Sequence, residues 1–245
     1  MARCPRRSSA SSRSGSAPRW RPWRPSTCGS PTPLLRGSSW PADRRARIHG
    51  FRQPADALRS LLGELLVRSL IGERLGPDVA RAPFARGPHG KPRVAGHADV
   101  HFNLSHSGDW AVCAVDSQPI GVDVERIVPL TPADLGAALS PAERAYLDGL
   151  AAAARPVALF RLWTLKESHT KALGLGLALE PRELTIACWE TPPRIMPPPA
   201  ETWVLDTPPL DADHALAVCR RAPVTPLEIV SVPTLPTVAS GLLRD

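Results

Sequence analysis

The sequence has no apolar run approaching the roughly 18 residues that a membrane span requires, so we expect no contact with a membrane. Cysteine is scarce: five residues, an odd number without a CxxC pair, argue against a disulfide framework or a zinc site. Cys113, Cys188 and Cys219 lie in apolar, strand-like stretches and are expected to be buried free thiols. These absences predict a protein of the reducing cytoplasm.

Acidic residues are missing from the first 40 positions, which contain eight arginines. The remaining 22 basic and 23 acidic side chains nearly cancel. The formal charge of +7 and the isoelectric point near 9.8 therefore come from this terminal stretch. The folded body is not basic, which argues against nucleic acid as its partner.

Residues 1–40 are rich in Arg, Ser and Pro and show neither strand alternation nor a helical period, so they are predicted to be a disordered tail. The same composition fits a transit peptide or an RNA-binding arm. Six prolines disfavour the amphipathic helix that a transit peptide needs. A tail without folded function, or a misassigned start, is the remaining interpretation.

From residue 41 the pattern alternates between helices and strands. Asp56–Leu75 reads as an amphipathic helix ended by Gly76-Pro77, followed by a loop over residues 80–99. Further helices are predicted from Thr131-Pro132, from the capping box that begins at Ser140, and over Leu159–Lys171, which Gly174 and Gly176 close. Strands are predicted over 100–104, 110–115, 120–125, 183–189, 202–205, 214–220 and 227–232, with a proline-rich loop over 191–200. A helix followed by three strands thus occurs twice, which predicts two similar α+β halves.

The strand over 120–125 carries two carboxylates on one face. Asp123 and Glu125 are two positions apart, about 6.5 Å along a strand, and repel each other unless a cation lies between them. Glu167 and Lys171, four apart, share one face of the helix over 159–171. Three carboxylates from a strand and a helix would suit Mg²⁺. The alternatives are an exposed acidic edge and an ordinary surface ion pair.

A polar stretch, Asn103–Asp109, is predicted to be the turn between the first two of these strands. One interpretation is a hairpin loop built from ordinary turn residues. The other is an anion-binding turn, in which hydroxyls and backbone N–H groups converge.

Four motifs in this order resemble those of the 4'-phosphopantetheinyl transferases of the Sfp type, which serve nonribosomal peptide and polyketide synthases. They are Gly90-Lys91-Pro92, Phe102–Ser107, Ile120–Glu125 and Trp163–Lys171. The resemblance covers residues 41–232. It implies a monomeric α+β fold of two pseudo-twofold halves, taken here as 41–128 and 129–245, with the active site in the cleft between them.

The resemblance also implies the chemistry. The enzyme would transfer the phosphopantetheine arm of CoA to a serine of an apo acyl or peptidyl carrier protein and release 3',5'-ADP. Asp123, Glu125 and Glu167 resemble the ligands of Mg²⁺, with Mn²⁺ as the alternative ion. Glu167 would act as the base, and Lys171 would contact the pyrophosphate. The remaining expected CoA contacts are Arg44, Arg47, Arg59, Ser60, Lys91, Ser105 and His106.

Two features depart from the family pattern: residues 1–40 lack the strand that opens the family's first half, and His169 replaces a less polar residue. The rival hypotheses are a CoA-binding protein without catalysis and a nucleic-acid binder that works through its tail.

The chain contains only three lysines, Lys91, Lys166 and Lys171, and all of them lie in the matched motifs. We therefore expect a need for lysine that arginine does not meet at these sites.

Overall fold

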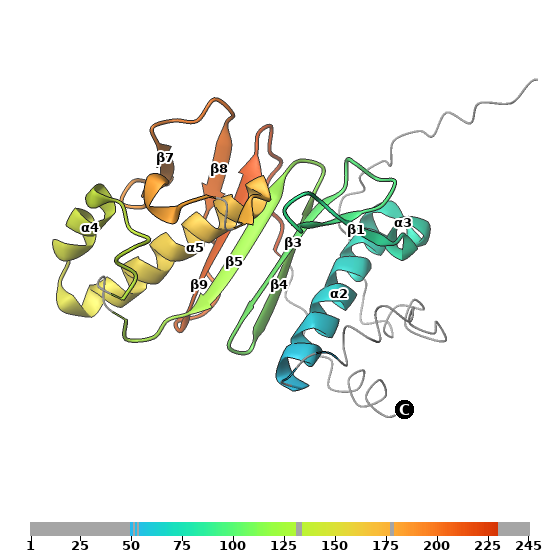
Figure 1. Cartoon of the computed structure of the whole chain (residues 1–245), viewed down its shortest axis with the longest axis horizontal. Helices are drawn as coiled ribbons and strands as arrows, with labels where there is room; N and C mark the ends of the chain where they lie inside the picture. The colour runs from blue at the N-terminus through green and yellow to red at the C-terminus, as the bar shows by residue number, and fades with distance from the viewer. Residues whose placement is uncertain (1–49, 51, 53, 131–133, 177–178, 230–245) are drawn as a thin grey trace, which may run out of the picture.

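The computed structural model describes residues 50, 52, 54–130, 134–176 and 179–229. The predicted tail, Arg44, Arg47 and the helix start at Thr131 lie outside these residues. The described chain mixes helices with small antiparallel sheets, as predicted (Figure 1). None of the helices in these ranges is long and apolar enough to cross a membrane.

The first part of the fold packs α2 (Pro54–Leu75) against the antiparallel pair β3 (His101–Ser107) and β4 (Trp110–Asp116), and α3 (Pro77–Arg81) packs against α2. Helix α2 matches the predicted helix and begins two residues earlier. The predicted loop over 80–99 is wrong in part, because β1 (Phe84–Arg86) and β2 (Pro92–Val94) form a hairpin there. Such three-residue strands are too short to show a period in sequence.

The second part of the fold packs α5 (Arg155–Leu173) against a sheet in the order β5-β9-β8, formed by Ile120–Arg126, His214–Arg221 and Trp203–Asp206. The predicted capping box is present: Ser140 and Glu143 bond reciprocally at the start of α4 (Pro141–Asp148). Gly174 ends α5 in the left-handed conformation, with φ of 73°.

Three predictions for the C-terminal region need correction. The strand expected over 183–189 is shorter, β6 (Thr185–Ala187). The proline-rich stretch is not purely a loop, since β7 (Arg194–Met196) lies within it and pairs with β6. Residues 227–229 of the expected last strand are not in a strand, and 230–232 lie outside the described residues. A run of apolar residues, as in this last case, forms a strand only where a neighbouring strand offers backbone hydrogen bonds.

Strands β3 and β5 lie side by side in the middle of the molecule (Figure 1), joined by side chains and not by a backbone ladder. The N–H groups of Val122, Val124 and Arg126 donate to the side chains of Asn103, Ser105 and Ser107, respectively, at 2.8, 3.3 and 3.0 Å. Each bond joins residues 19 positions apart, so the two strands run parallel. We call these three side chains of β3, with their β5 partners, the polar seam.

The polar seam corrects the prediction for Asn103–Asp109. Only Gly108 and Asp109 form the turn, because β3 extends to Ser107. Alternation of Asn103, Ser105 and Ser107 is therefore a strand period, not turn chemistry. The turn predicted for Asn103–Ser107 is therefore wrong, and the anion-binding interpretation stays a prediction. The hydroxyls of Ser105 and Ser107 instead contact carboxylates of the protein itself, as described below.

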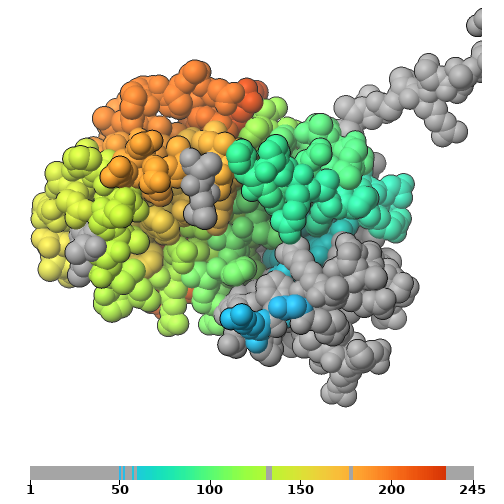
Figure 2. Space-filling view, in the orientation of Figure 1, coloured from blue at the N-terminus to red at the C-terminus, as the bar shows by residue number. Residues whose placement is uncertain are grey.

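Three hydrophobic clusters stabilise this arrangement. One lies under α5, one lies between α2 and β3, and the third covers the apolar face of β5 and β9. Residues of β4, including Trp110 and Val112, pack against the third cluster, so apolar contact also crosses the middle of the molecule. Cys188 and Cys219 are buried free thiols, as predicted, and Cys113 is a partly buried one. Figure 2 shows the cyan-to-green N-terminal and yellow-to-orange C-terminal elements on opposite sides of the surface.

Candidate functional site

A cleft of about 810 Å³ lies over the polar seam, between the two parts of the fold. It brings together Asp123, Glu125, Glu167 and Lys171 from β5 and α5, as the sequence predicted. The opposite wall comes from α2, the β1–β2 hairpin and β3–β4, and includes Ser60, Phe84, Arg86, Phe102, Ser105 and His106. The cleft therefore has an acidic end with one lysine and a wall that mixes apolar and basic groups.

Gly121 allows α5 to approach β5 closely enough to form the acidic end. A Cβ atom at this position would lie 2.0 Å from the carbonyl oxygen of Ser168 and 2.4 Å from the backbone nitrogen of Ala172. No side chain fits there, so the backbone of α5 lies directly on the strand. Gly121 is two positions from Asp123, and alternate strand residues share a face. Asp123 is thereby directed at the helix that carries Glu167 and Lys171.

Asp123 is the most buried ionisable group of the cleft, with a side chain only 2% exposed. Its Oδ1 atom accepts hydrogen bonds from Ser105 Oγ at 2.8 Å and from Lys171 Nζ at 2.5 Å. Lys171 Nζ also lies 3.2 Å from Ser105 Oγ. Burial raises the pKa of Asp123, and the ammonium and hydroxyl groups oppose that rise. Asp123 Oδ2 is buried and has no hydrogen-bond partner among the described residues.

Glu125 and Glu167 complete the acidic end. Burial is the main cause that raises the pKa of each of them, and repulsion from Asp123 adds to it. The hydroxyl of Ser107 donates to Glu125 Oε2 at 2.9 Å, which opposes the rise for that residue. Ser107 therefore orients one carboxylate while its oxygen accepts the N–H of Arg126.

These residues suit a divalent cation in charge and donor type. Repulsion from Asp123 contributes to the raised pKa of Glu125 and of Glu167, and the buried Asp123 Oδ2 has no hydrogen-bond partner among the described residues. Hard cations such as Mg²⁺ prefer such oxygens. Among the described residues, however, no three His, Cys, Asp or Glu side chains are placed so that they could hold a metal ion together. Lys171 supplies the positive charge beside Asp123 in this structure.

The expected CoA contacts occupy different places. Ser60 and the exposed His106 line the cleft. Ser105 also lines it, but its hydroxyl is engaged by Asp123, Val124 and Lys171. Arg59 lies in α2, and its side chain is outside the description. Lys91 points elsewhere, as described below.

Lys166, the other lysine of the motif Trp163–Lys171, points away from the cleft into the C-terminal core. It is 1% exposed and forms an ion pair of 2.8 Å with Glu143, which is itself fully buried. Its ammonium also donates to the carbonyl oxygens of Pro181, at 2.7 Å, and Leu184. Lys166 thus joins α5 to α4 and to the segment before β6.

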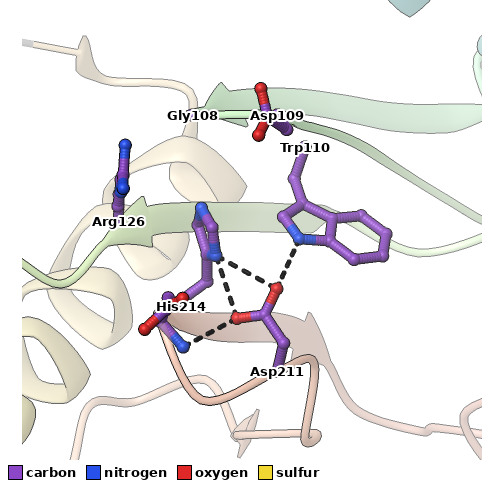
Figure 3. Close-up of a pocket in the computed structure, with 7 residues that line it drawn as sticks. Gly108, Asp109, Trp110, Arg126, Asp211 and His214 are labelled. Carbon is purple, nitrogen blue, oxygen red and sulfur yellow. Dashed lines mark hydrogen bonds and ion pairs between the residues drawn. The ribbon is translucent and has the colours of Figure 1, made fainter.

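A smaller cavity of about 160 Å³ lies at the far end of the seam (Figure 3). Asp211 accepts hydrogen bonds there from Trp110 Nε1 at 2.7 Å and from the backbone N–H of Asp213 at 2.9 Å. Its carboxylate also lies 2.9 Å from His214 Nδ1. The ring of His214 lies against Gly108, where a Cβ atom would approach Nε2 to 2.7 Å. This cluster ties the β3–β4 turn to the loop before β9.

The sequence prediction missed several residues of the site. Arg86 and Asp211 are not among the predicted residues, and Asn103 and Ser107 are predicted only as members of the polar turn, not as partners of β5. The polar alternation along β3 was the signal that could have identified Asn103 and Ser107. Arg86 and Asp211 carry no local signal, because tertiary structure alone brings them to the cleft and to the seam.

The fold and the site define a two-part α+β protein whose cleft combines three carboxylates with a lysine. Family models agree with this class: 4'-phosphopantetheinyl transferase, N-terminal, matches residues 21–118, and the 4'-phosphopantetheinyl transferase superfamily matches residues 119–219. The chain belongs to the 4'-phosphopantetheinyl transferase family. The N-terminal match begins inside the predicted tail.

Individual relatives support the assignment. A 4'-phosphopantetheinyl transferase of Bacillus subtilis is 34% identical over 184 residues, 74% of this chain and 82% of the relative. Sfp of Bacillus subtilis (strain 168) is 32% identical over 192 residues, covering 78% and 86%. A 4'-phosphopantetheinyl transferase of Bacillus pumilus is 36% identical over 183 residues, covering 74% and 78%.

Proposed function

We propose that this protein transfers the 4'-phosphopantetheine arm of CoA to a serine of an apo acyl or peptidyl carrier protein and releases 3',5'-ADP. The observation that carries the proposal is the gathering of Asp123, Glu125, Glu167 and Lys171 in one cleft of a chain from this family. In this reaction the serine oxygen forms a bond to the β-phosphorus of CoA as the bond to the departing phosphate breaks.

We assign Glu167 as the base that takes the serine proton. Its pKa is raised by burial and by repulsion from Asp123, which brings a carboxylate closer to the working range of a base near neutral pH. Its place on α5, one turn before Lys171, puts both groups at the same end of the cleft. The serine would therefore approach along that face of the helix.

Lys171 would neutralise part of the negative charge of the pyrophosphate directly, and the carboxylates of β5 would contribute by holding a cation. Phosphoryl transfer depends mainly on positioning and on stabilisation of charge. The side chain of Lys171 is 29% exposed and lines the cleft, so an incoming phosphate can reach it. Asp123, Glu125 and Glu167 would hold Mg²⁺, or Mn²⁺ as the alternative, and the ion would supply charge neutralisation at the phosphates.

Several finer features belong to the same proposal. The pseudo-twofold relation is supported by the parallel seam strands, each paired on its outer side with an antiparallel neighbour. Helix α2 packs on one pair and α5 on the other. We further propose a cytoplasmic monomer that acts on carrier domains of secondary metabolism, as the resemblance to Sfp suggests.

The test is mass spectrometry of apo carrier domains after incubation with the protein, CoA and Mg²⁺. We expect the carrier to gain the mass of one phosphopantetheine arm. Glu167→Gln should lower kcat by about 100-fold or more, a typical loss for a general base. The control is Glu183→Gln, which alters an exposed glutamate of the same half. Full activity of Glu167→Gln would remove Glu167 as the base, and failure of wild type on every carrier would leave a CoA-binding protein.

A further inference from the structure

The ammonium group of Lys91 is surrounded by backbone carbonyl oxygens. Lys91 Nζ donates to the carbonyl oxygens of Lys171 at 2.6 Å, Ile120 at 2.9 Å and Ala172 at 3.1 Å. An ammonium has three N–H donors, so all of them are used. Lys91 is absent from the lining of the cleft, although its neighbour Pro92 contributes to it.

The carbonyl groups that Lys91 contacts belong to two different elements of the site. Lys171 and Ala172 are in the last turn of α5, where helix carbonyls have no partner within the helix and carry partial negative charge. Ile120 begins β5. The contact therefore joins the end of the helix that carries Glu167 and Lys171 to the start of the strand that carries Asp123 and Glu125.

The path of the Lys91 side chain is as constrained as its end. Lys91 follows the turn of the β1–β2 hairpin, where Gly87 N–H donates to the Lys91 carbonyl oxygen at 2.8 Å. The side chain then crosses Gly174, where a Cβ atom would lie 3.1 Å from Lys91 Cδ. Burial lowers the pKa of Lys91 to about 8, so the group is still mostly protonated at pH 7.

We infer that Lys91 is a positioning residue, which fastens the C-terminal turn of α5 to β5 and thereby sets the place of Lys171 and Glu167 beside Asp123. Gly121 lets the helix backbone lie against the strand, and Lys91 bonds the two elements together at the same point. Lysine suits this position because three donors radiate from one atom, whereas the guanidinium of arginine is a planar fork. This role differs from the direct CoA contact that the family resemblance implies for Lys91.

The inference rests on the proposed transfer reaction, so the test includes a readout that does not need activity. Lys91→Met keeps most of the side-chain stem and removes the donors. Hydrogen exchange should become faster in the peptide that covers residues 168–176 and stay unchanged in the peptide that covers α2. Arg93→Met is the matched control, because Arg93 is exposed on the same hairpin.

Kinetics then separate positioning from direct phosphate contact. Wild type, Lys91→Met and Lys91→Arg are compared with CoA and with CoA that lacks the 3'-phosphate. We expect kcat to fall about 10- to 100-fold with both substrates in both variants, as for a displaced reacting group. The ratio of kcat/KM between the two substrates should stay as in wild type.

A ratio that falls toward one in Lys91→Met would overturn the inference, because Lys91 would then recognise the 3'-phosphate. Unchanged exchange over residues 168–176 would overturn it as well. If Lys91→Met does not fold, the kcat of Lys91→Arg decides the inference. This variant keeps the charge, so a wild-type kcat would contradict the need for lysine at this position. Wild-type protein that transfers nothing from CoA would refute the proposed reaction, while the exchange result would still decide the role of Lys91.

Discussion

At the residue scale, the lysines of this chain show how one side-chain type serves three purposes. Lys171 faces the cleft and pairs with Asp123, Lys166 is buried with Glu143, and Lys91 binds backbone carbonyls. The expectation that each position needs lysine thus acquires a structural reason: two of the three ammonium groups bond to several acceptors around one atom. A compact charge meets that demand better than a fork.

Removing the ammonium of Lys166 should destabilise the fold more than it affects substrate binding. Lys166→Met leaves the buried Glu143 carboxylate without its ion pair, which costs about 3–5 kcal/mol for comparable buried pairs. The measurement is the free energy of unfolding in urea. Arg182→Met, an exposed change in the segment that Lys166 contacts, is the control. A loss below about 1 kcal/mol would place this pair among weak surface interactions.

His169 is the polar residue of α5 that the site does not use. It is 5% exposed, it lies edge-on to Trp203 with ring centroids 5.3 Å apart, and neither ring nitrogen has a partner among the described residues. Burial lowers its pKa to about 4. The contact of His169 with the ring of Trp203 explains why a less polar residue would also fit at this position.

His169→Phe should therefore stabilise the protein, increasingly so at low pH. The unfolded chain binds a proton near pH 6.5 and the folded chain only near pH 4, so wild type loses stability as the pH falls between these values. Over the same pH range, the free energy of unfolding of the phenylalanine variant should fall less than that of wild type, by up to about 3 kcal/mol. Urea titrations at pH 7 and pH 4 measure it. If the free energy of unfolding depends on pH equally in both proteins, protonation of His169 does not destabilise the folded state.

At the element scale, the approach of α5 to β5 decides whether the carboxylates and Lys171 meet. The tightest contact is at Gly121, where the obstacle is helix backbone and cannot rotate away. The contact between α2 and β3 is less tight. A Cβ atom at Gly63 of α2 would lie 3.3 Å from a flexible methyl group of Leu104. Only the first contact determines the geometry of the acidic end.

Gly121→Ala should push α5 off the strand. We expect a loss of at least about 3 kcal/mol in the free energy of unfolding, at the upper end of overpacking effects, together with a large fall in kcat. Gly149→Ala is the control, because the φ of Gly149 is −72° and a Cβ atom there would lie 3.4 Å from the carbonyl oxygen of Tyr146. Wild-type melting temperature and activity in Gly121→Ala would show that the helix can move without harm to the site.

At the scale of the whole molecule, the two parts of the fold are joined at both ends of β5 and along that strand. Lys91 connects them at the start of β5, the polar seam runs along the strand, and Asp211 bonds to Trp110 at the far end. The hydrophobic cluster on the opposite face of β5 includes partners from β4. The cleft is therefore a product of this boundary and not of either part alone.

We accordingly expect the two parts to unfold in one transition. Tryptophan fluorescence and far-ultraviolet circular dichroism should give coincident urea curves, the usual sign of two-state behaviour. Ser107→Ala, which removes one bond of the seam and one to Glu125, should lower the midpoint without separating the curves. Two separated transitions in wild type would show that the parts are independently stable.

Local patterns in the sequence were enough to predict much of this protein. The alternation around Asp123 and Glu125, the capping box at Ser140 and the glycine stop after α5 are decided by residues close together in the chain, and each is present. The carboxylates and Lys171 could be assigned to one site because strand and helix periods, with the family resemblance, set their faces. Short strands such as β1 and β7 could not be predicted, because their partners define them.

Tertiary structure alone decided which partners the polar side chains find. Nothing near Lys91 in sequence indicates the carbonyl groups of α5, 80 residues away, and nothing near Asp211 indicates Trp110. Local sequence predicts a turn for Asn103, Ser105 and Ser107, because hydroxyls and amides favour turns, yet these side chains accept from N–H groups of a strand 19 residues further on. The physical reason is that hydrophobic periodicity is a local property of the chain, whereas a buried hydrogen-bonding group takes whichever partner the packed fold brings within reach.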